Sequence, residues 1–334
     1  MRDLNQILDS SIETIKGKSI LIAVSGGADS MFLACALIEL RKSLDLKLAI
    51  ASVDHSLREE SAEELAFVHD FSIANEVPFF SAKLTIPKNM PNGIEAWARE
   101  ERYRELEHMR IKAGCDWIAT AHHRNDQAET IMFKLGRGTG AAGLMGIHEV
   151  DQARHIIRPI INCDPKEMRE YLRSRGQEWR EDPSNQDTKY SRNEIRHKLL
   201  PKWESMEPGI TDELVQLAHK ANSIIPKISN WAKSIYRFEE TDRGYSISLS
   251  QRDIAEDDGS LLRIAMDDVW GKMNVGYPGN KRWSRIIDCV VKNKRYCEEI
   301  SDNVQVWVRS RHNSPVLSIE RIEGAPAKNN RSKN

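Results

Sequence analysis

The chain has 334 residues, with 40% hydrophobic and 30% charged side chains and a formal net charge of −1, which is typical of a soluble globular protein with room for two domains. No apolar run approaches the ~20 residues of a membrane helix, and residues 1–16 lack the apolar core of a signal peptide, so we expect a cytoplasmic protein without a membrane partner. The five cysteines form no CxxC pair, which argues against a disulfide framework and against a zinc or iron–sulfur site.

The first part of the chain alternates short apolar, β-prone runs with helical stretches, after an amphipathic helix between Leu4 and Ile15. This alternation predicts an α/β fold with a doubly wound, five-stranded parallel sheet covered on both faces. Such sheets bind ligands beyond the carboxyl ends of their strands. We expect strands over residues 19–24, 46–53, 77–84, 117–121 and 155–161. We expect helices over residues 31–41, 62–75, 95–113, 125–135 and 166–175.

The pattern changes after Pro201. Apolar residues spaced by four and three predict a long helix over 211–236, kinked at Pro226, which we interpret as a connector rather than an intermolecular coiled coil. Two helical stretches near 261–270 and 281–292 follow, and then a hairpin of 304–310 with 316–322. The oligomeric state is not predicted. We expect a catalytic domain 1–201, a connecting helix 202–240, a smaller, mainly helical domain 241–323 with a C-terminal hairpin, and a polar, disordered tail 324–334.

A glycine-rich loop follows the first strand and leads directly into a helix. Its glycines allow a tight turn and close approach of a ligand, and the helix N-terminus adds N–H donors for an anion. Asp29 could hold Mg²⁺ beside bound phosphates, but no lysine closes the loop, so this is not the GxxxxGK[ST] phosphate loop. The alternative is a strand–helix turn without a chemical role. The loop reads Ser25, Gly26, Gly27, Ala28, Asp29, Ser30.

Other polar residues recur near expected strand ends. His55 follows the second strand, and the alternative there is a surface histidine. Arg99 and Arg102 lie three apart on one helix face, where two guanidiniums suit phosphate oxygens or simply a solvated surface. Arg192 and Arg196, four apart before Pro201, allow the same two interpretations.

His122, Asp126 and Glu129 are spaced by four and three, so they share a face if the helix begins by residue 122. A histidine with two carboxylates could bind a divalent metal or an ammonium group. The alternative is a capped helix start in which Asp126 interacts with the helix dipole.

The SGGxDS loop on the first strand resembles that of the ATP-pyrophosphatase superfamily. Six further segments, in this order and spacing, resemble tRNA(Ile)-lysidine synthetase over about residues 18–201. They are Val53-Asp54-His55-Ser56-Leu57-Arg58, the EAWAREERY run from Glu95, the TAHHRNDQAET run from Thr120, Gly136-Arg137-Gly138-Thr139-Gly140, Arg158-Pro159, and Asp182-Pro183-Ser184-Asn185 leading to Arg192-Asn193-Glu194-Ile195-Arg196.

The resemblance implies an adenine-nucleotide hydrolase-like fold, ATP and Mg²⁺ as cofactors, and tRNA(Ile) with a CAU anticodon and free L-lysine as partners. It places ATP at residues 25–30, with His55 beside the adenosine; Arg99 and Arg102 are the candidates for its phosphates, and Asp29 is the candidate for Mg²⁺. It places the lysine amine or Mg²⁺ at Asp126 and Glu129. His122 would position the reacting groups, and Arg192 would meet phosphate or carboxylate.

The implied reaction is a two-step ligation. The C2 oxygen of the wobble cytidine attacks the α-phosphorus of ATP and pyrophosphate leaves; the ε-amine of lysine then attacks C2 and displaces AMP. No covalent enzyme intermediate is required, so the protein contributes positioning and charge neutralisation.

Two other interpretations remain open. A tRNA-thiolating enzyme of the same superfamily would usually carry CxxC pairs or a catalytic cysteine, and the pairs are missing here. A non-catalytic nucleotide- or tRNA-binding module would not need the charged residues Asp29, Asp126 and Glu129.

Two stretches of the chain are modestly basic. Residues 154–202 contain 12 Lys/Arg against 8 Asp/Glu, and residues 281–311 contain 8 against 4. We expect tRNA contacts from the C-terminal part, with a merely solvated surface as the alternative.

Overall fold

The computed structural model describes residues 4, 8–54, 61–85, 94–136, 138–181, 191–249, 259–273, 275, 278–301, 303–311 and 314–322. The described residues form two compact units. Unit 1 consists of residues 1–130 and 147–215, and unit 2 of residues 131–146 and 216–334. The hairpin turn at residues 312–313 and the tail expected to be disordered lie outside the described residues. Within the described part, no helix is long and apolar enough to span a membrane.

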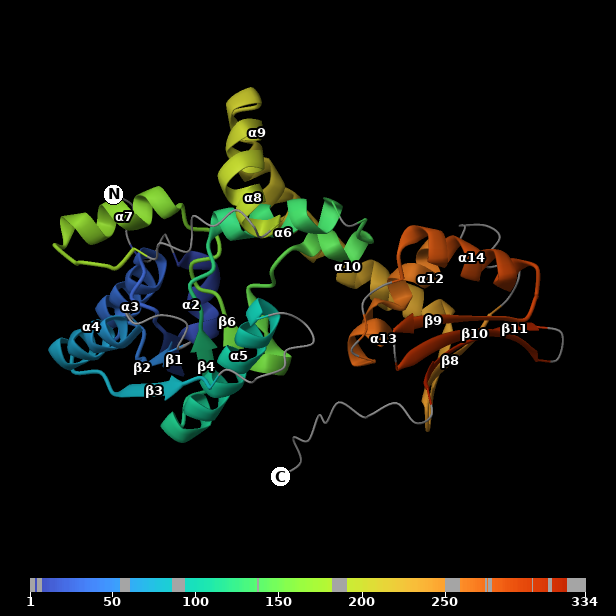
Figure 1. The fold of residues 1–334 in the computed structure, drawn as a ribbon, viewed down its shortest axis with the longest axis horizontal. Coiled ribbons are helices and arrows are strands. Elements are labelled where there is room, and N and C mark those ends of the chain that lie inside the picture. The colour runs from blue at the N-terminus through green and yellow to red at the C-terminus, as the bar shows by residue number, and fades with distance from the viewer. Residues whose placement is uncertain are drawn as a thin grey trace. The chain divides into compact units, whose positions relative to one another are not determined.

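The predicted parallel sheet is the centre of unit 1 (Figure 1). Its five parallel strands run in the order β3-β2-β1-β4-β6, and a short β5 pairs antiparallel to β6 at the edge. The strands are β1 Ser19–Ala23, β2 Lys47–Asp54, β3 Phe79–Lys83, β4 Trp117–Ala119, β5 Val150–Asp151 and β6 Ile156–Ile157. The chain builds outward from β1 to β3 and then from β4 to β6. The switch point, where such sheets bind ligands, therefore lies between β1 and β4.

Alternating side chains of β1 and β2 fill two separate cores, one on each face of the sheet, because successive residues of a strand point to opposite faces. Ile20 and Ile22 pack with α2, α3, α4 and α7, whereas Leu21 and Ala23 pack with Leu106 of α5 and its neighbours. These helices are α2 Asp9–Ile15, α3 Ala28–Leu40, α4 Ser61–Ala74, α5 Ile94–Ala113 and α7 Pro165–Ser174. The covering on both faces confirms the expected doubly wound α/β class.

Helix α6, Arg124–Gly136, begins five residues after β4 ends and carries the expected carboxylates. Further along unit 1, a helical run consists of α8 Ser191–Glu194, a π-helical turn Ile195–Leu199, and α9 Leu200–Met206. Pro201 falls in the first turn of α9, where a missing N–H breaks no helical bond.

The long predicted helix is α10, Ile210–Ile235, with Pro226 inside it. Unit 2 then contains an antiparallel sheet in the order β7-β8-β11-β10-β9. The expected hairpin is β10–β11, and three further strands extend it, so this unit has more strand than the sequence predicted. The strands are β7 Arg237–Thr241, β8 Gly244–Ser248, β9 Tyr296–Ser301, β10 Val304–Arg311 and β11 Ser314–Arg321.

One face of this second sheet is buried by helices of unit 2. Val304, Val306 and Val308 alternate inward along β10 and pack with buried residues such as Trp270 and Ile286. The helices that carry this core are α12 Ser260–Ala265, α13 Asp267–Lys272 and α14 Asn280–Val291. The single helix expected over 261–270 is thus two short ones, which meet at Met266.

Candidate functional site

The loop between β1 and α3 is held in one conformation by its own hydrogen bonds. Gly26 has a φ of +86°, in the left-handed region that only glycine enters readily. The Ser30 hydroxyl accepts a bond from the Ser25 N–H at 3.2 Å and donates to the Gly27 carbonyl at 2.9 Å. Arg180 donates its backbone N–H to the Gly26 carbonyl at 2.9 Å. No side chain caps α3 at Gly27, so the first-turn N–H groups are available to an anion.

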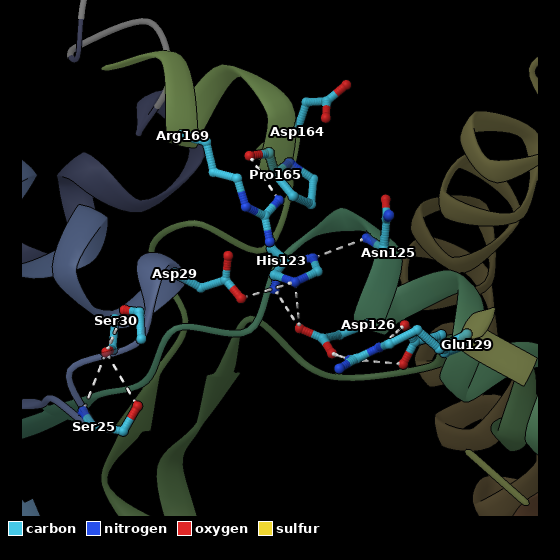
Figure 2. A network of polar contacts seen from close by, with 12 residues as sticks. Ser25, Asp29, Ser30, His123, Asn125, Asp126, Glu129, Asp164, Pro165 and Arg169 are labelled. Atoms are coloured by element: carbon cyan, nitrogen blue, oxygen red, sulfur yellow. Dashed lines mark hydrogen bonds and ion pairs between the residues drawn. The ribbon is translucent and has the colours of Figure 1, made fainter. Parts of the chain in front are cut away.

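Asp29, in the first turn of α3, links this loop to the start of α6. Its Oδ2 lies 3.4 Å from Nε2 of His123, and the same Nε2 lies 3.4 Å from Oδ2 of Asp126. Figure 2 shows the resulting row of side chains, from Ser25 and Ser30 through Asp29 and His123 to Asp126 and Glu129. The structure therefore joins Asp29, in the glycine-rich loop, to the predicted carboxylate Asp126 through His123.

His123 caps helix α6 as well as joining the carboxylates. Its Nδ1 accepts the backbone N–H of Asn125 at 3.2 Å, so the ring proton of the neutral form sits on Nε2, between Asp29 and Asp126. Asp126 accepts the backbone N–H of His123 at 3.0 Å, which completes a reciprocal cap. Burial lowers the pKa of His123, but the hydrogen bond with Asp29 and the charges of Asp126 and Asp29 outweigh it, so this pKa is raised.

Two arginines from the helical run at 191–206 form hydrogen bonds with the carboxylates of Asp126 and Glu129. Arg196 donates from Nε and Nη2 to the two oxygens of Glu129 at 2.6 and 3.0 Å, and from Nη2 to Asp126 at 2.7 Å. Arg192 makes longer contacts with Glu129 and Asp126, at 3.3 and 3.4 Å. Glu129 is 1% exposed, so the paired guanidiniums supply the charge that a buried carboxylate requires.

The charges around Asp126 favour its ionised form. Burial raises the pKa of Asp126, but the charges of His123, His122, Arg196 and Arg192 outweigh burial and lower it. Burial likewise lowers the pKa of Arg196, whereas the hydrogen bond with Glu129 and the charges of Glu129, Asp126 and Asp29 raise it overall. The site is therefore a compact group of opposite charges at neutral pH.

His122 has a different environment from that of its neighbour. Its Nδ1 lies 3.0 Å from the Thr120 hydroxyl. Burial, with the charges of Arg158, Arg99 and Arg102, lowers the pKa of His122 to about 3 despite the charge of Asp126. His122 is thus neutral at physiological pH.

The arginines near His122 form a second positive region of unit 1. Arg158 is 7% exposed; its Nη1 donates to the His148 carbonyl, while its buried Nε has no partner among the described atoms. Arg99 lies over the Tyr103 ring at 5.6 Å, and burial and the charge of Arg99 lower the pKa of Arg102. Within the described ranges, none of these three arginines pairs with a carboxylate.

The predicted residues therefore separate into two groups. Asp29, Asp126, Glu129 and Arg192 are linked by ion pairs through His123 and Arg196, while His122 lies where the charges of Asp126, Arg99 and Arg102 all act on it. His55 and the segment around it lie outside the described residues. The sequence reasoning missed His123. The sequence does contain a signal for His123. This residue lies directly before the expected helix, and the acidic Asp126 follows three residues later, which is a helix-capping pattern.

Comparisons with known proteins identify the family of the chain. Residues 1–203 match the PP-loop domain family. The tRNA(Ile)-lysidine synthase of Solibacter usitatus is 39% identical over 223 residues, covering 66% of this chain and 48% of that protein. The one from Nitratidesulfovibrio vulgaris is 37% identical, covering 62% and 61%. The one from Petrotoga mobilis is 31% identical over 255 residues, covering 75% and 79%.

The chain spans about half the length of the relatives from Solibacter usitatus and Thermotoga sp. (48% and 52%). Among solved structures, the U34-tRNA thiolase NcsA from Methanococcus maripaludis has a TM-score of 0.57 at 15% identity, over 65% of this chain and 76% of that one. At this identity the likeness concerns the fold alone.

Proposed function

Because this chain belongs to the tRNA(Ile)-lysidine synthase family and carries that family's PP-loop domain, we propose that it joins L-lysine to the wobble cytidine of tRNA(Ile) with a CAU anticodon, and that ATP drives this ligation. The observation that carries the proposal is that Asp29, directly before Ser30 in the glycine-rich loop, contacts His123, which also contacts Asp126 beside Glu129 (Figure 2). A phosphate-binding loop thereby adjoins a site with both signs of charge.

The loop binds the phosphates of ATP. Its preset turn at Gly26 and the uncapped start of α3 direct N–H groups at an anion without reorganisation. The C2 oxygen of cytidine attacks the α-phosphorus, and pyrophosphate leaves. Arg99, Arg102 and Arg158, which lack carboxylate partners in the described part of the chain, supply further positive charge for substrate phosphates.

Asp29 is the candidate ligand of Mg²⁺. Its Oδ1 is buried with no hydrogen-bond partner in the described structure, as expected of a carboxylate oxygen that binds a cation. Among the described residues, no group of three or more His, Cys, Asp or Glu could hold a metal. Mg²⁺ is usually bound by one or two carboxylates and substrate phosphates, so a single protein carboxylate suffices. When bound, Mg²⁺ neutralises charge on the phosphates.

Asp126, Glu129, Arg192 and Arg196 match a substrate that carries both charges. Free lysine presents a carboxylate that suits a guanidinium fork and ammonium groups that suit carboxylates. In the second step, the ε-amine must lose a proton before it attacks C2 and displaces AMP; the charges of Asp126 and Glu129 hold the lysine ammonium group beside C2 until that proton leaves. His123 holds Asp29 and Asp126 in place through the proton on its Nε2.

The decisive experiment is mass spectrometry of tRNA(Ile) after incubation with the protein, ATP and lysine. We expect the mass of one lysine residue to be added to a cytidine of the anticodon, and only when ATP is present. Pyrophosphate release without this product, or a mass gain that corresponds to sulfur, would reject the proposal.

A further inference from the structure

The helical run at 191–206 carries three large apolar side chains on its outside. Leu199 is 50% exposed, Trp203 37% and Met206 68%. Their spacing of four and three places them on one helix face, while Ile195 and Leu200 of the same run are buried. We call Leu199, Trp203 and Met206 the Trp203 face. In Figure 1, α9 extends outward from α8, away from the sheet of unit 1. Scattered exposed apolar side chains are ordinary, but a contiguous row on a projecting helix indicates a binding surface.

Two lysines line the Trp203 face, together with Glu194, Glu204 and the exposed Glu207. Lys198 and Lys202 are four residues apart, each directly before a residue of the face. Glu204 is turned toward the start of α10, where its oxygens accept from the Gly209 N–H at 2.6 Å and from the N–H and hydroxyl of Thr211 at 3.0 and 2.7 Å. Glu194 lies 3.7 Å from Lys198, and Lys202 has no ion-pair partner in the described part of the chain. Lys202 therefore offers a cation beside apolar side chains on which a base could stack.

The same helical run leads into the candidate site. Arg196, which binds Asp126 and Glu129, precedes Trp203 by seven residues, or about 10 Å of helix rise. A stacked nucleic-acid strand advances about 3.4 Å per nucleotide. Trp203 therefore lies within about three nucleotides of the turn that carries Arg196.

We propose that the Trp203 face, with Lys198 and Lys202, binds the unpaired anticodon-loop nucleotides that flank the reacting cytidine, with a base stacked on Trp203 and phosphates at the lysines. This proposal rests on the proposed function, since it takes tRNA as the substrate. Single-stranded RNA is bound in this way generally, by aromatic side chains beside positive charge. If a second copy of the chain docked on the same face, the lysines of the two copies would lie close together and repel each other. An RNA strand brings phosphates instead, so this repulsion does not arise.

The test compares full-length variants for binding of a fluorescently labelled RNA stem–loop with a CAU anticodon. We expect Trp203→Ala to weaken binding about 5- to 100-fold, the range for loss of one base stack. Trp203→Phe keeps a ring and should stay within about threefold of wild type. The matched control is Trp231→Ala, which removes a 58% exposed tryptophan from α10 and should leave the affinity unchanged. Lys198→Ala with Lys202→Ala should flatten the salt dependence of binding.

The outcomes separate this inference from the proposed function. If wild type binds the stem–loop and Trp203→Ala, folded by its thermal transition, binds equally well, the inference is wrong and lysidine formation stands untouched. If wild type makes no lysidine yet stem–loop binding still depends on Trp203, the proposed function is wrong and this RNA surface stands. A change in molar mass on Trp203→Ala, with unchanged RNA affinity, would assign the face to a second copy and overturn the inference.

Discussion

The two oxygens of Asp29 have different surroundings, and only one of them has a partner among the described residues. Oδ2 faces His123, whereas Oδ1 is buried without a hydrogen-bond partner among the described atoms. A buried oxygen of this kind costs free energy unless a ligand satisfies it. We interpret this cost as the mark of a site prepared for a cation.

Asp29→Asn should therefore slow pyrophosphate release by about 10²–10³, the usual loss for one preorganised charged contact. Ser30→Ala should also slow it, because Ser30 fixes the loop through Ser25 and Gly27. The control is Asp70→Asn, whose exposed carboxylate lies on α4. Release at the wild-type rate in both loop variants would show that the loop is not the ATP site.

Asp126→Asn and Glu129→Gln should each impair lysine transfer more than pyrophosphate release, because these carboxylates meet the amine in the second step. The two steps can be measured separately, as pyrophosphate formed and as lysine incorporated into tRNA. Wild-type lysine incorporation by both variants would remove these residues from the amine site.

Arg196→Ala should destabilise the fold by about 2–4 kcal/mol, because it leaves the buried Glu129 carboxylate short of its bidentate partner. The value is discounted because the Arg196 side chain is itself partly exposed. Arg192→Ala is the matched control and should cost less, since its contacts are longer. Urea unfolding of the two variants measures this difference, and equal losses would contradict the ranking.

His122 should make stability fall with acidification. Its folded pKa is about 3 and its unfolded pKa about 6.5, so below pH 6.5 the unfolded chain binds a proton that the folded chain refuses. Between pH 6.5 and pH 5, the free energy of unfolding should fall by at most about 2 kcal/mol because of His122. The raised pKa of His123 acts in the opposite direction, because the folded chain holds this proton more tightly than the unfolded chain, and the lowered pKa of Asp126 acts only at more acidic pH.

His122→Asn should abolish this part of the pH dependence in urea unfolding, while His108→Asn, at an exposed site on α5, should retain it. An unchanged slope in His122→Asn would show that His122 is not the group responsible.

The sequence predicted Asp126 and Glu129 for one site from their spacing along a helix, whereas Arg192 was predicted separately, as a pair with Arg196. It could not choose between the adjacent His122 and His123. The two side chains diverge because the chain leaves β4 and enters α6 between them, so a one-residue shift in the helix start exchanges their surroundings. The contact of Asp29 with His123 joins segments about 90 residues apart, which no local pattern reveals.

At the scale of elements, helix α14 carries the basic group that we expect to contact tRNA. Arg282 and Arg285 both lie within 3.3 Å of one Glu298 oxygen, so this acid offsets part of their charge. Reversing Lys281, Arg282 and Arg285 should weaken tRNA binding and reduce the salt slope by about 2 rather than 3, because the group with Glu298 carries a net charge of about +2. Titrations at two salt concentrations measure this, and unchanged slopes would place the contact elsewhere.

Strong periodicity made the parallel strands and the long helix predictable, and weak periodicity explains what was missed. β5 has two residues, too few to show alternation. β6 stops at Ile157 because the chain turns at residues 158–162, so the strand expected over 155–161 is short. β7 and β9 are the edges of the second sheet and carry charged residues such as Glu239 and Glu298, as edge strands commonly do.

At the scale of the whole molecule, unit 1 reaches beyond Pro201. Asp212 pairs with Arg124 at 2.8 Å, and Glu204 caps the start of α10. A fragment 1–215 should therefore resist urea better than a fragment 1–201, and both should bind ATP while losing tRNA affinity. Equal urea midpoints would show that residues 202–215 do not stabilise unit 1. Full tRNA affinity in either fragment would show that unit 2 does not contact tRNA.

The chain passes between the two units after Thr130, after Gly146 and after Val215. During synthesis, residues 131–146 therefore leave the ribosome 70 residues (216 − 146) ahead of the rest of unit 2. At about 5–20 residues per second, this early segment waits roughly 4–14 s for the chain it will pack with. Throughout that interval, unit 1 must fold although residues 131–146, which interrupt its sequence, belong to unit 2. A translational pause before residue 216 would prolong the period in which this segment is open to proteases and chaperones.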